Sequence, residues 1–65
     1  MEVVIIGSGN VATVLGRLML ANGHQVKQVW SRTEANARSL ATELGAGAVM
    51  DISLIDRGAD LYLLA

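Results

Sequence analysis

A short glycine-rich segment near the start of the chain has a spacing that could hold a phosphate. Gly7, Gly9 and Ala12 form Gly-x-Gly-x-x-Ala directly after the apolar run Val3-Val4-Ile5-Ile6. The first glycine permits a sharp turn, the second lets a phosphate approach the backbone, and the small third residue allows close helix packing. A helix that begins here would point free N–H groups and its positive dipole end toward an anion. The pattern therefore predicts a site for the pyrophosphate of a dinucleotide.

Two polar side chains lie inside this turn. Ser8 and Asn10 can each donate a hydrogen bond to a phosphate, and Asn10 can alternatively serve only as the cap of the following helix. The three small residues alone could also be a chance match in a chain rich in Ala and Gly. Their place between a predicted strand and a predicted helix, in a βαβ unit of suitable length, favours nucleotide binding.

The segment after the second predicted strand differs from the one usual in NAD-binding proteins. An Asp or Glu about 20 residues past the glycines ordinarily binds the ribose 2′-hydroxyl, but Ser31-Arg32-Thr33 stands here. A guanidinium pairs with a 2′-phosphate through two hydrogen bonds, whereas a carboxylate repels it. Ser31 and Thr33 add hydroxyl donors, so the segment favours NADP over NAD, FAD or S-adenosylmethionine. The alternative is that Arg32 is a solvated loop residue and Thr33 only a helix cap.

Alternating strand and helix patterns supply the scaffold for both segments. Apolar runs predict strands over residues 2–6, 25–30, 46–50 and 61–65. Helical spacing predicts two helices, over residues 10–21 and 34–44. It also predicts a short helical segment with Ile52, Leu54 and Ile55, which Asp51 would cap and Gly58 would end.

The apolar stripes of the two long helices identify the faces that we expect to pack on the sheet. In the first helix the stripe consists of Val11, Val14, Leu15, Leu18 and Met19. In the second helix it consists of Ala37, Leu40, Ala41 and Leu44. Gly16 lies one turn beyond Ala12 and is expected to serve close packing. Asn22-Gly23 and Gly45 are expected to end the two helices.

Strands that alternate with helices predict an α/β fold with parallel pairing and right-handed crossovers. In a Rossmann-type sheet flanked by helices, this first half has the strand order 3-2-1-4. The chain ends inside an apolar strand, so we expect residues 1–65 to be a truncated NAD(P)-binding Rossmann domain. We expect the rest of a longer parent chain, or a homo-oligomer, to complete the sheet. The alternative is a short protein that finishes its sheet by oligomerising.

Composition excludes several other classes of protein. The chain is 52% hydrophobic and 17% charged, with a net charge of −1 and no basic run, so no nucleic-acid partner is expected. It has no Cys and only one His, so no metal site is expected. No apolar stretch approaches the roughly 20 residues that span a bilayer, and no targeting segment is visible, which predicts a cytoplasmic protein without membrane contact.

Some residues that could carry chemistry have plainer interpretations. His24 is expected to be structural or exposed. Trp30 is expected to pack in the layer between sheet and helices, and the alternative is a place near the adenine of the dinucleotide. The three acids Asp51, Asp56 and Asp60 show no pairing with a base and are expected to cap or to be solvated.

The chain resembles the N-terminal part of pyrroline-5-carboxylate reductase-like proteins. It is similar too to the deazaflavin-dependent NADP reductases and to the wider 6-phosphogluconate dehydrogenase-like group. The resemblance rests on Val3 to Ala12, on Asn22-Gly23-His24 before the second strand, and on Ser31-Arg32-Thr33 after it. It covers all 65 residues but only the first half of such a cofactor domain.

This resemblance implies an NADP-dependent oxidoreductase that transfers a hydride to or from a small molecule. It implies that Ser8, Gly9, Asn10 and Val11 meet the pyrophosphate and that residues 31–33 meet the 2′-phosphate. Substrate residues would come from a C-terminal helical domain, so no catalytic residue is assigned and the 65-residue piece is not expected to act alone. The alternative from another class is a non-catalytic nucleotide-binding or redox-sensing module, which would use the same phosphate-binding physics.

Overall fold

The computed structural model describes all 65 residues, and its elements follow the predicted order. Four strands run over Glu2–Ile6 (β1), Gln25–Trp30 (β2), Gly47–Val49 (β3) and Leu61–Leu64 (β4). Two helices run over Asn10–Ala21 (α1) and Glu34–Leu44 (α2), and a short 3₁₀ turn covers Ile52–Leu54 (η1). The predicted boundaries of the strands and helices are therefore confirmed to within one residue at each end.

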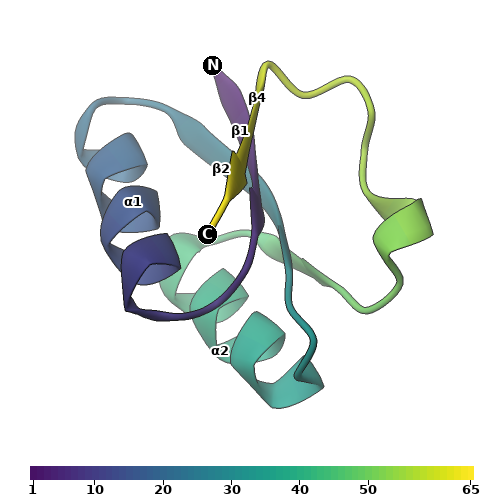
Figure 1. Cartoon of the computed structure of the whole chain (residues 1–65). Helices are drawn as coiled ribbons and strands as arrows, with labels where there is room; N and C mark the ends of the chain where they lie inside the picture. The colour runs from purple at the N-terminus through teal and green to yellow at the C-terminus, as the bar shows by residue number, and fades with distance from the viewer.

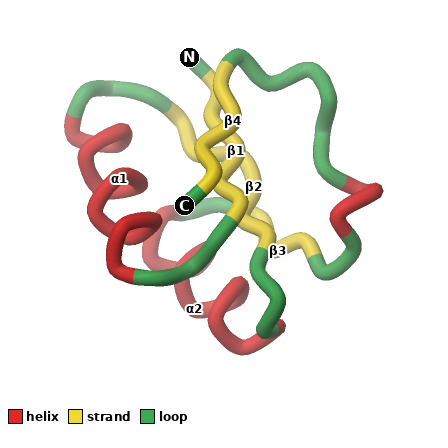
Figure 2. The backbone as a smooth tube through the Cα atoms, viewed as in Figure 1, coloured by secondary structure: helices red, strands yellow, loops and turns green.

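The four strands form one sheet in the order β3-β2-β1-β4, and every neighbouring pair is parallel. Helices α1 and α2 lie on one side of the sheet, and the segment that carries η1 lies on the other side (Figures 1 and 2). This confirms the predicted α/β fold and the order 3-2-1-4. Because all strands are parallel, the carboxyl ends of β1, β2 and β4 meet at one edge, where sheets of this kind bind ligands.

The core lies between the sheet and the two helices. It is a cluster of eight buried residues: Val3, Ile5, Ala12, Val26, Val29, Leu40, Ala41 and Leu44. The predicted apolar stripe of α2 is confirmed, because all four of its residues are buried. A Cβ atom added at Gly16 would come within 2.5 Å of Leu44 Cδ1 and 3.1 Å of Ile5 Cδ1. Gly16 therefore allows α1 to pack closely on its neighbours, as expected.

The face of α1 that packs on the sheet differs from the predicted one. The buried residues of α1 are Ala12 and Gly16, whereas Val11, Val14 and Leu18 are 63%, 61% and 51% exposed. Helix α1 is apolar around most of its circumference, so apolar spacing alone does not select its buried side. The small residues determine which side of α1 is buried, because only on their side can the helix approach Ile5 and Leu44 closely. The prediction that Val11, Val14 and Leu18 belong to the buried stripe is wrong.

The helix ends agree with the expected glycines but not with every expected cap. Gly45 and Gly23 have φ of +69° and +81°, in the left-handed region that glycine adopts readily. The N-cap of α1 is Gly9, so Asn10 does not cap that helix. Thr33 occupies the N-cap position of α2, but its side chain forms no capping hydrogen bond. Asp51 caps η1 by accepting from the Ser53 N–H, yet the turn ends at Leu54, well before Gly58.

The pairing of β1 with β2 is interrupted by one extra residue. Val3 pairs with Val26 and Val4 pairs with Gln28, so Lys27 has no partner in β1. In a regular strand, Val26 and Val29 would point to opposite faces. Both belong to the core cluster, because the extra residue shifts the alternation by one.

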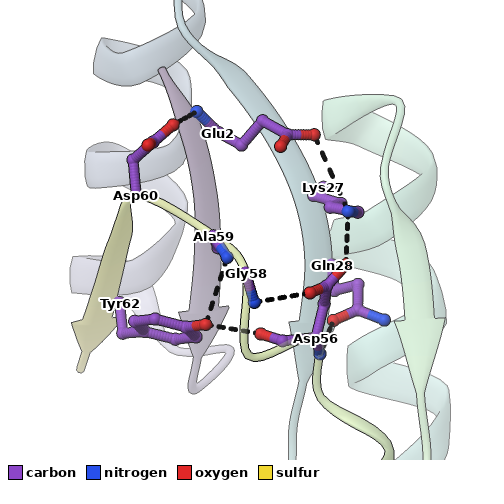
Figure 3. A network of polar contacts seen from close by, with 8 residues as sticks. All are labelled: Glu2, Lys27, Gln28, Asp56, Gly58, Ala59, Asp60 and Tyr62. Atoms are coloured by element: carbon purple, nitrogen blue, oxygen red, sulfur yellow. Dashed lines mark hydrogen bonds and ion pairs between the residues drawn. The ribbon is translucent and has the colours of Figure 1, made fainter.

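A polar network holds the segment between η1 and β4 against the face of the sheet opposite the helices (Figure 3). Lys27 forms ion pairs with Asp56 and Glu2. The Asp56 N–H donates to Gln28 Oε1 at 2.7 Å, and the Tyr62 hydroxyl donates to the Asp56 carbonyl. The expectation that Asp56 has no basic partner is therefore wrong, because its carboxylate forms an ion pair with a lysine from β2. The hydrogen bond from Lys27 holds the pKa of Asp56 below its ordinary value.

Candidate functional site

A cleft of about 650 Å³ opens at the carboxyl ends of β1, β2 and β4. The turn after β1, the turn after β2 and the end of β4 surround it, as the sheet order requires. Its lining consists of Ile6, Gly7, Ser8, Trp30, Ser31, Arg32, Thr33, Asn36, Leu64 and Ala65. The two segments that the sequence analysis selected, 23 residues apart at Ser8 and Ser31, thus border one cavity.

Gly7 shapes the turn after β1. Its φ of +137° is a conformation that residues with a side chain rarely adopt. Its N–H donates to the Trp30 carbonyl at 2.7 Å, which joins the turn to the end of β2. A Cβ atom here would lie 2.1 Å from the Ala65 carbonyl oxygen. Both the turn and the close approach of the chain after β4 therefore require glycine at this position.

Gly9 leaves open space at the beginning of α1. A Cβ atom added to it would meet nothing within 4 Å. No protein group accepts a hydrogen bond from the N–H groups of Ser8, Gly9, Asn10 or Val11. These donors lie in the first turn of a 12-residue helix or directly before it, where the helix dipole is positive. The arrangement has the shape and charge that suit an anion such as a pyrophosphate.

The turn after β2 combines one buried and two exposed polar residues. Ser31 is 8% exposed, and its Oγ lies 2.7 Å from Ser8 Oγ. Arg32 and Thr33 are exposed. The ion pairs of the molecule involve Arg17, Lys27 and Arg38, so the Arg32 guanidinium has no carboxylate partner. Arg32 is thus an unpaired positive charge at the mouth of the cleft.

The structure divides the predicted site residues into three groups. Gly7, Ser8, Ser31, Arg32 and Thr33 line the cleft. Gly9, Asn10 and Val11 are exposed at the adjoining start of α1. Ala12 is fully buried in the core, so its side chain supports the helix from below.

Sequence reasoning missed Asn36 as a residue of this region. It lies in the first turn of α2 and lines both the main cleft and a smaller one of about 210 Å³ between α1 and α2. Its place three residues after Thr33, on the side of α2 nearest the turn, is the signal that could have revealed it. The smaller cleft also includes Ser8 and Glu43, and the latter forms an ion pair with Arg17 across the two helices.

Trp30 lies on the cleft side and not in the layer between the sheet and the helices, so the favoured interpretation is wrong and a place near the adenine stays a prediction. It is absent from the core cluster, lines the cleft, and donates from its indole N–H to the Met50 carbonyl at 3.3 Å. The extra residue at Lys27 sets this orientation, since Val29 then faces the helices and Trp30 the opposite side. His24 contacts the N-terminal amine through Nδ1 at 3.1 Å, beside the amino ends of β1 and β2 and so at the opposite end of the sheet from the cleft.

No three His, Cys, Asp or Glu side chains come together in a way that could hold a metal ion. None of the helices combines the length and the apolar character that crossing a membrane requires.

Comparison with known families identifies the class of this protein. The profile of the family described as "NADP oxidoreductase coenzyme F420-dependent" matches residues 2–65. The chain therefore belongs to this family, whose description names a nicotinamide dinucleotide. The resemblance to NADP-dependent oxidoreductases stated from the sequence is confirmed.

Two solved structures share the fold over nearly the whole chain. The "putative NADP oxidoreductase BF3122" from Bacteroides fragilis superposes with a TM-score of 0.92 at 38% identity, over 97% of this chain and 24% of that one. GenD2 from gentamicin A biosynthesis, in complex with NAD, superposes with a TM-score of 0.88 at 24% identity, over all of this chain and 20% of that one. The second likeness concerns the fold alone.

A sequence relative agrees with this class. Glucose-fructose oxidoreductase domain-containing protein 2 from Xenopus tropicalis is 39% identical over 41 residues, which are 63% of this chain and 11% of that protein. The chain thus spans about a quarter or less of the length of the relatives that it matches.

Proposed function

We propose that this chain binds the adenosine and pyrophosphate half of NADP and serves as part of the cofactor domain of an oxidoreductase. The observation that carries the proposal is the pairing of two features at one cleft. The start of α1 offers unpaired N–H donors beside an open Gly9, and the turn after β2 offers the unpaired charge of Arg32. The first feature suits a pyrophosphate and the second a 2′-phosphate.

Each site residue has a role in this proposal. Gly7 and Ala12 shape the turn and seat α1 on the sheet. Ser8, Gly9, Asn10 and Val11 bind the pyrophosphate through their N–H groups and the two polar side chains. Ser31, Arg32 and Thr33 form the region that receives the 2′-phosphate, with Arg32 as its only cation.

The residues of this chain hold and orient the cofactor, and none of them is assigned to catalysis. The nicotinamide supplies the hydride chemistry when the dinucleotide is bound. Holding the adenosine and phosphate end at the strand edge directs the other end away from the turn after β1. We infer that residues 1–65 are the first half of a dinucleotide-binding domain. The small-molecule substrate would bind to a further part of the protein, and a continuing chain or a second copy would extend the sheet beyond β4.

Replacement of Arg32 tests the choice between NADP and NAD. In the full-length protein, Arg32→Ala should weaken NADP binding by about tenfold to a hundredfold, because a charge-assisted pair with the 2′-phosphate is lost. NAD has no 2′-phosphate, so its dissociation constant should change by less than about twofold. Isothermal titration calorimetry with both dinucleotides measures the two values.

Arg57→Ala is the matched control, because Arg57 is also an exposed arginine without an ion-pair partner and lies outside the cleft. It should leave both dissociation constants unchanged. Equal losses for NADP and NAD in Arg32→Ala would contradict the assignment of the 2′-phosphate to this residue.

A further inference from the structure

Three apolar side chains form a row across the carboxyl ends of β2, β1 and β4. Ile6 pairs with Trp30 of β2 on one side and with Leu64 of β4 on the other, so the three residues lie side by side. The residue before each of them belongs to the core cluster or packs against it on the helix side. Because successive side chains of a strand point to opposite faces, the row faces away from α1 and α2.

This row is the apolar side of the cleft. The apolar residues of the lining are the three members of the row and Ala65. Ile6 and Trp30 are half-buried, and Leu64 is 78% exposed. The volume of about 650 Å³ lies within the range of small-molecule sites, which combine apolar walls with a few polar groups. The cleft therefore suits a ligand that has an apolar part as well as a charged one.

Trp30 gives the row a flat aromatic surface that is held in place. Its indole N–H donates to the carbonyl of Met50, the residue directly after β3, at 3.3 Å. No other aromatic residue lines the cleft. Since the polar atom of the indole is bonded to the protein, its apolar ring faces are the part that a ligand can contact. A half-buried, anchored indole in a cleft is well suited to stacking with a flat ring.

The proposed phosphate sites decide which ring of the dinucleotide reaches Trp30. Arg32, the proposed partner of the 2′-phosphate, lies two residues after Trp30 and lines the same cleft. The 2′-phosphate and the adenine are attached to neighbouring carbons of one ribose, so the base must lie close to the group that Arg32 binds. The pyrophosphate leads from this ribose to the start of α1, so the nicotinamide lies farther from Trp30 than the adenine does.

We propose that Trp30 binds the adenine ring by stacking, and that Ile6 and Leu64 extend the apolar surface for the adenosine. The inference rests on the proposed function and deepens it, because it names the residues that contact the base. Adenine is common to NADP and NAD, so Trp30 contributes equally to the affinity for both. The choice between the two dinucleotides still depends on the turn after β2.

Two replacements of Trp30 in the full-length protein test this role. Trp30→Leu keeps an apolar side chain but removes the aromatic face, and it should weaken NADP and NAD by the same factor, about fivefold to a hundredfold. Trp30→Phe keeps a smaller aromatic face and should stay within about threefold of the wild type. Calorimetry with both dinucleotides measures these values. Leu54→Ala is the control, because Leu54 is 68% exposed and lies outside the cleft, and it should change neither dissociation constant.

A fluorescent ligand reports stacking separately from affinity. The 1,N6-etheno derivative of adenosine 2′,5′-bisphosphate has a fluorescent base and no nicotinamide. Its emission should fall when it binds to the wild type, because the indole quenches a base stacked on it. In Trp30→Phe the ligand should still bind, but the saturated complex should be about as bright as the free ligand. A purely structural role of Trp30 would leave the quenching unexplained, and this comparison holds even if Trp30→Leu does not fold.

The outcomes distinguish this inference from the function on which it rests. Unchanged affinity in Trp30→Leu, or quenching that persists in Trp30→Phe, would overturn the stacking role and leave the proposed function intact. A loss confined to NADP would also overturn it, because both dinucleotides carry the adenine. A wild-type protein that binds neither dinucleotide would overturn the proposed function itself.

Discussion

Gly7 and Gly9 stand two residues apart in one turn, yet the structure requires them for different reasons. Gly7 has a positive φ and lies against the Ala65 carbonyl, so its lack of a side chain serves the fold. Gly9 has an ordinary φ of −76° and open space around it, so nothing in the protein requires glycine there. The absence of a side chain at Gly9 is explained by something that approaches from outside, as the proposed pyrophosphate would.

Gly9→Val should therefore separate binding from folding. We expect loss of binding to both NADP and NAD, because the branched side chain fills the space beside the free N–H groups. Stability should fall by no more than about 1 kcal/mol, the scale of an unfavourable residue at a helix N-cap. Calorimetry with each dinucleotide and thermal unfolding of the same sample measure the two effects.

Gly7→Ala is the contrasting variant in the same turn. It should lower the free energy of unfolding by more than about 1 kcal/mol, because alanine at this φ is strained and its Cβ would meet backbone. A Gly9→Val protein that binds dinucleotides as tightly as the wild type would contradict the phosphate role of the turn.

Residue types and local spacing were sufficient to predict which two turns border the cleft, but not the contacts between them. The glycine turn and Ser31-Arg32-Thr33 each lie in a short stretch that directly follows a strand, and a parallel sheet brings such stretches to one edge. The bond between Ser8 and Ser31 depends on side-chain distances across 23 residues. The proximity of Asn36 depends on the angle at which α2 leaves the turn. No local pattern contains either distance.

At the scale of elements, α1 is held to the sheet by its smallest residues. Ala12 and Gly16 form its buried face, and the larger Val11, Val14 and Leu18 lie outside. The existence and length of α1 could be predicted because its N-terminal turn and its Asn22-Gly23 end are local signals. Its rotation about its own axis could not, because the side that packs is decided by clearance to Ile5 and Leu44.

Enlarging the small face should be costly. Gly16→Val should lower the free energy of unfolding by about 1–3 kcal/mol, because its side chain enters space occupied by Leu44 and Ile5. Leu18→Val introduces the same branched residue on the exposed side of α1 and should change stability by less than about 0.5 kcal/mol. Chemical denaturation measures the free energy of unfolding of both variants. Equal losses of stability would show that α1 does not pack on the sheet through Ala12 and Gly16.

For the molecule as a whole, the two faces of the sheet are covered by different means. Two helices and an apolar cluster cover one face. The segment between η1 and β4, which has little regular structure, crosses the other face. Its Asp56 contacts Lys27, Gln28 and Tyr62. Strand order could be predicted from the alternation of elements, but this network could not, because it joins residues about 28 positions apart by polar contacts.

The network should make stability sensitive to acid. The hydrogen bond from Lys27 lowers the pKa of Asp56 from its ordinary 3.8, so the folded state favours the ionised carboxylate. The resulting stabilisation is complete above pH 3.8 and is lost as the pH falls through the lower pKa of the folded state. The pKa of Lys27 is raised from 10.5, mainly by its hydrogen bond to Asp56, so its contribution persists through neutral pH and is lost only above 10.5.

Thermal unfolding between pH 3 and pH 7 should reveal this contribution. Asp56→Asn should be less stable than the wild type at neutral pH, and the difference should shrink as the pH falls below about 4. Glu34→Gln, which breaks an exposed pair with Arg38 inside α2, should give a curve close to that of the wild type throughout. A constant difference between Asp56→Asn and the wild type would show that the carboxylate charge does not stabilise the fold.

Lys27, which has no partner in β1, marks a position at which the chain could lose one residue without moving its core side chains to the other face. Lys27 separates two stretches of β2, each with a regular alternation of faces. A chain one residue shorter at this point would merge the stretches into an uninterrupted strand and leave Val26 and Val29 on their present face. The end of β2, from which Ser31 and Arg32 extend, would keep its pairing with β1. At most positions of a strand, deletion of one residue would turn the following side chains to the opposite face. Deletion of Lys27 would not, so the residues of β2 that lead into the cleft would keep their orientation.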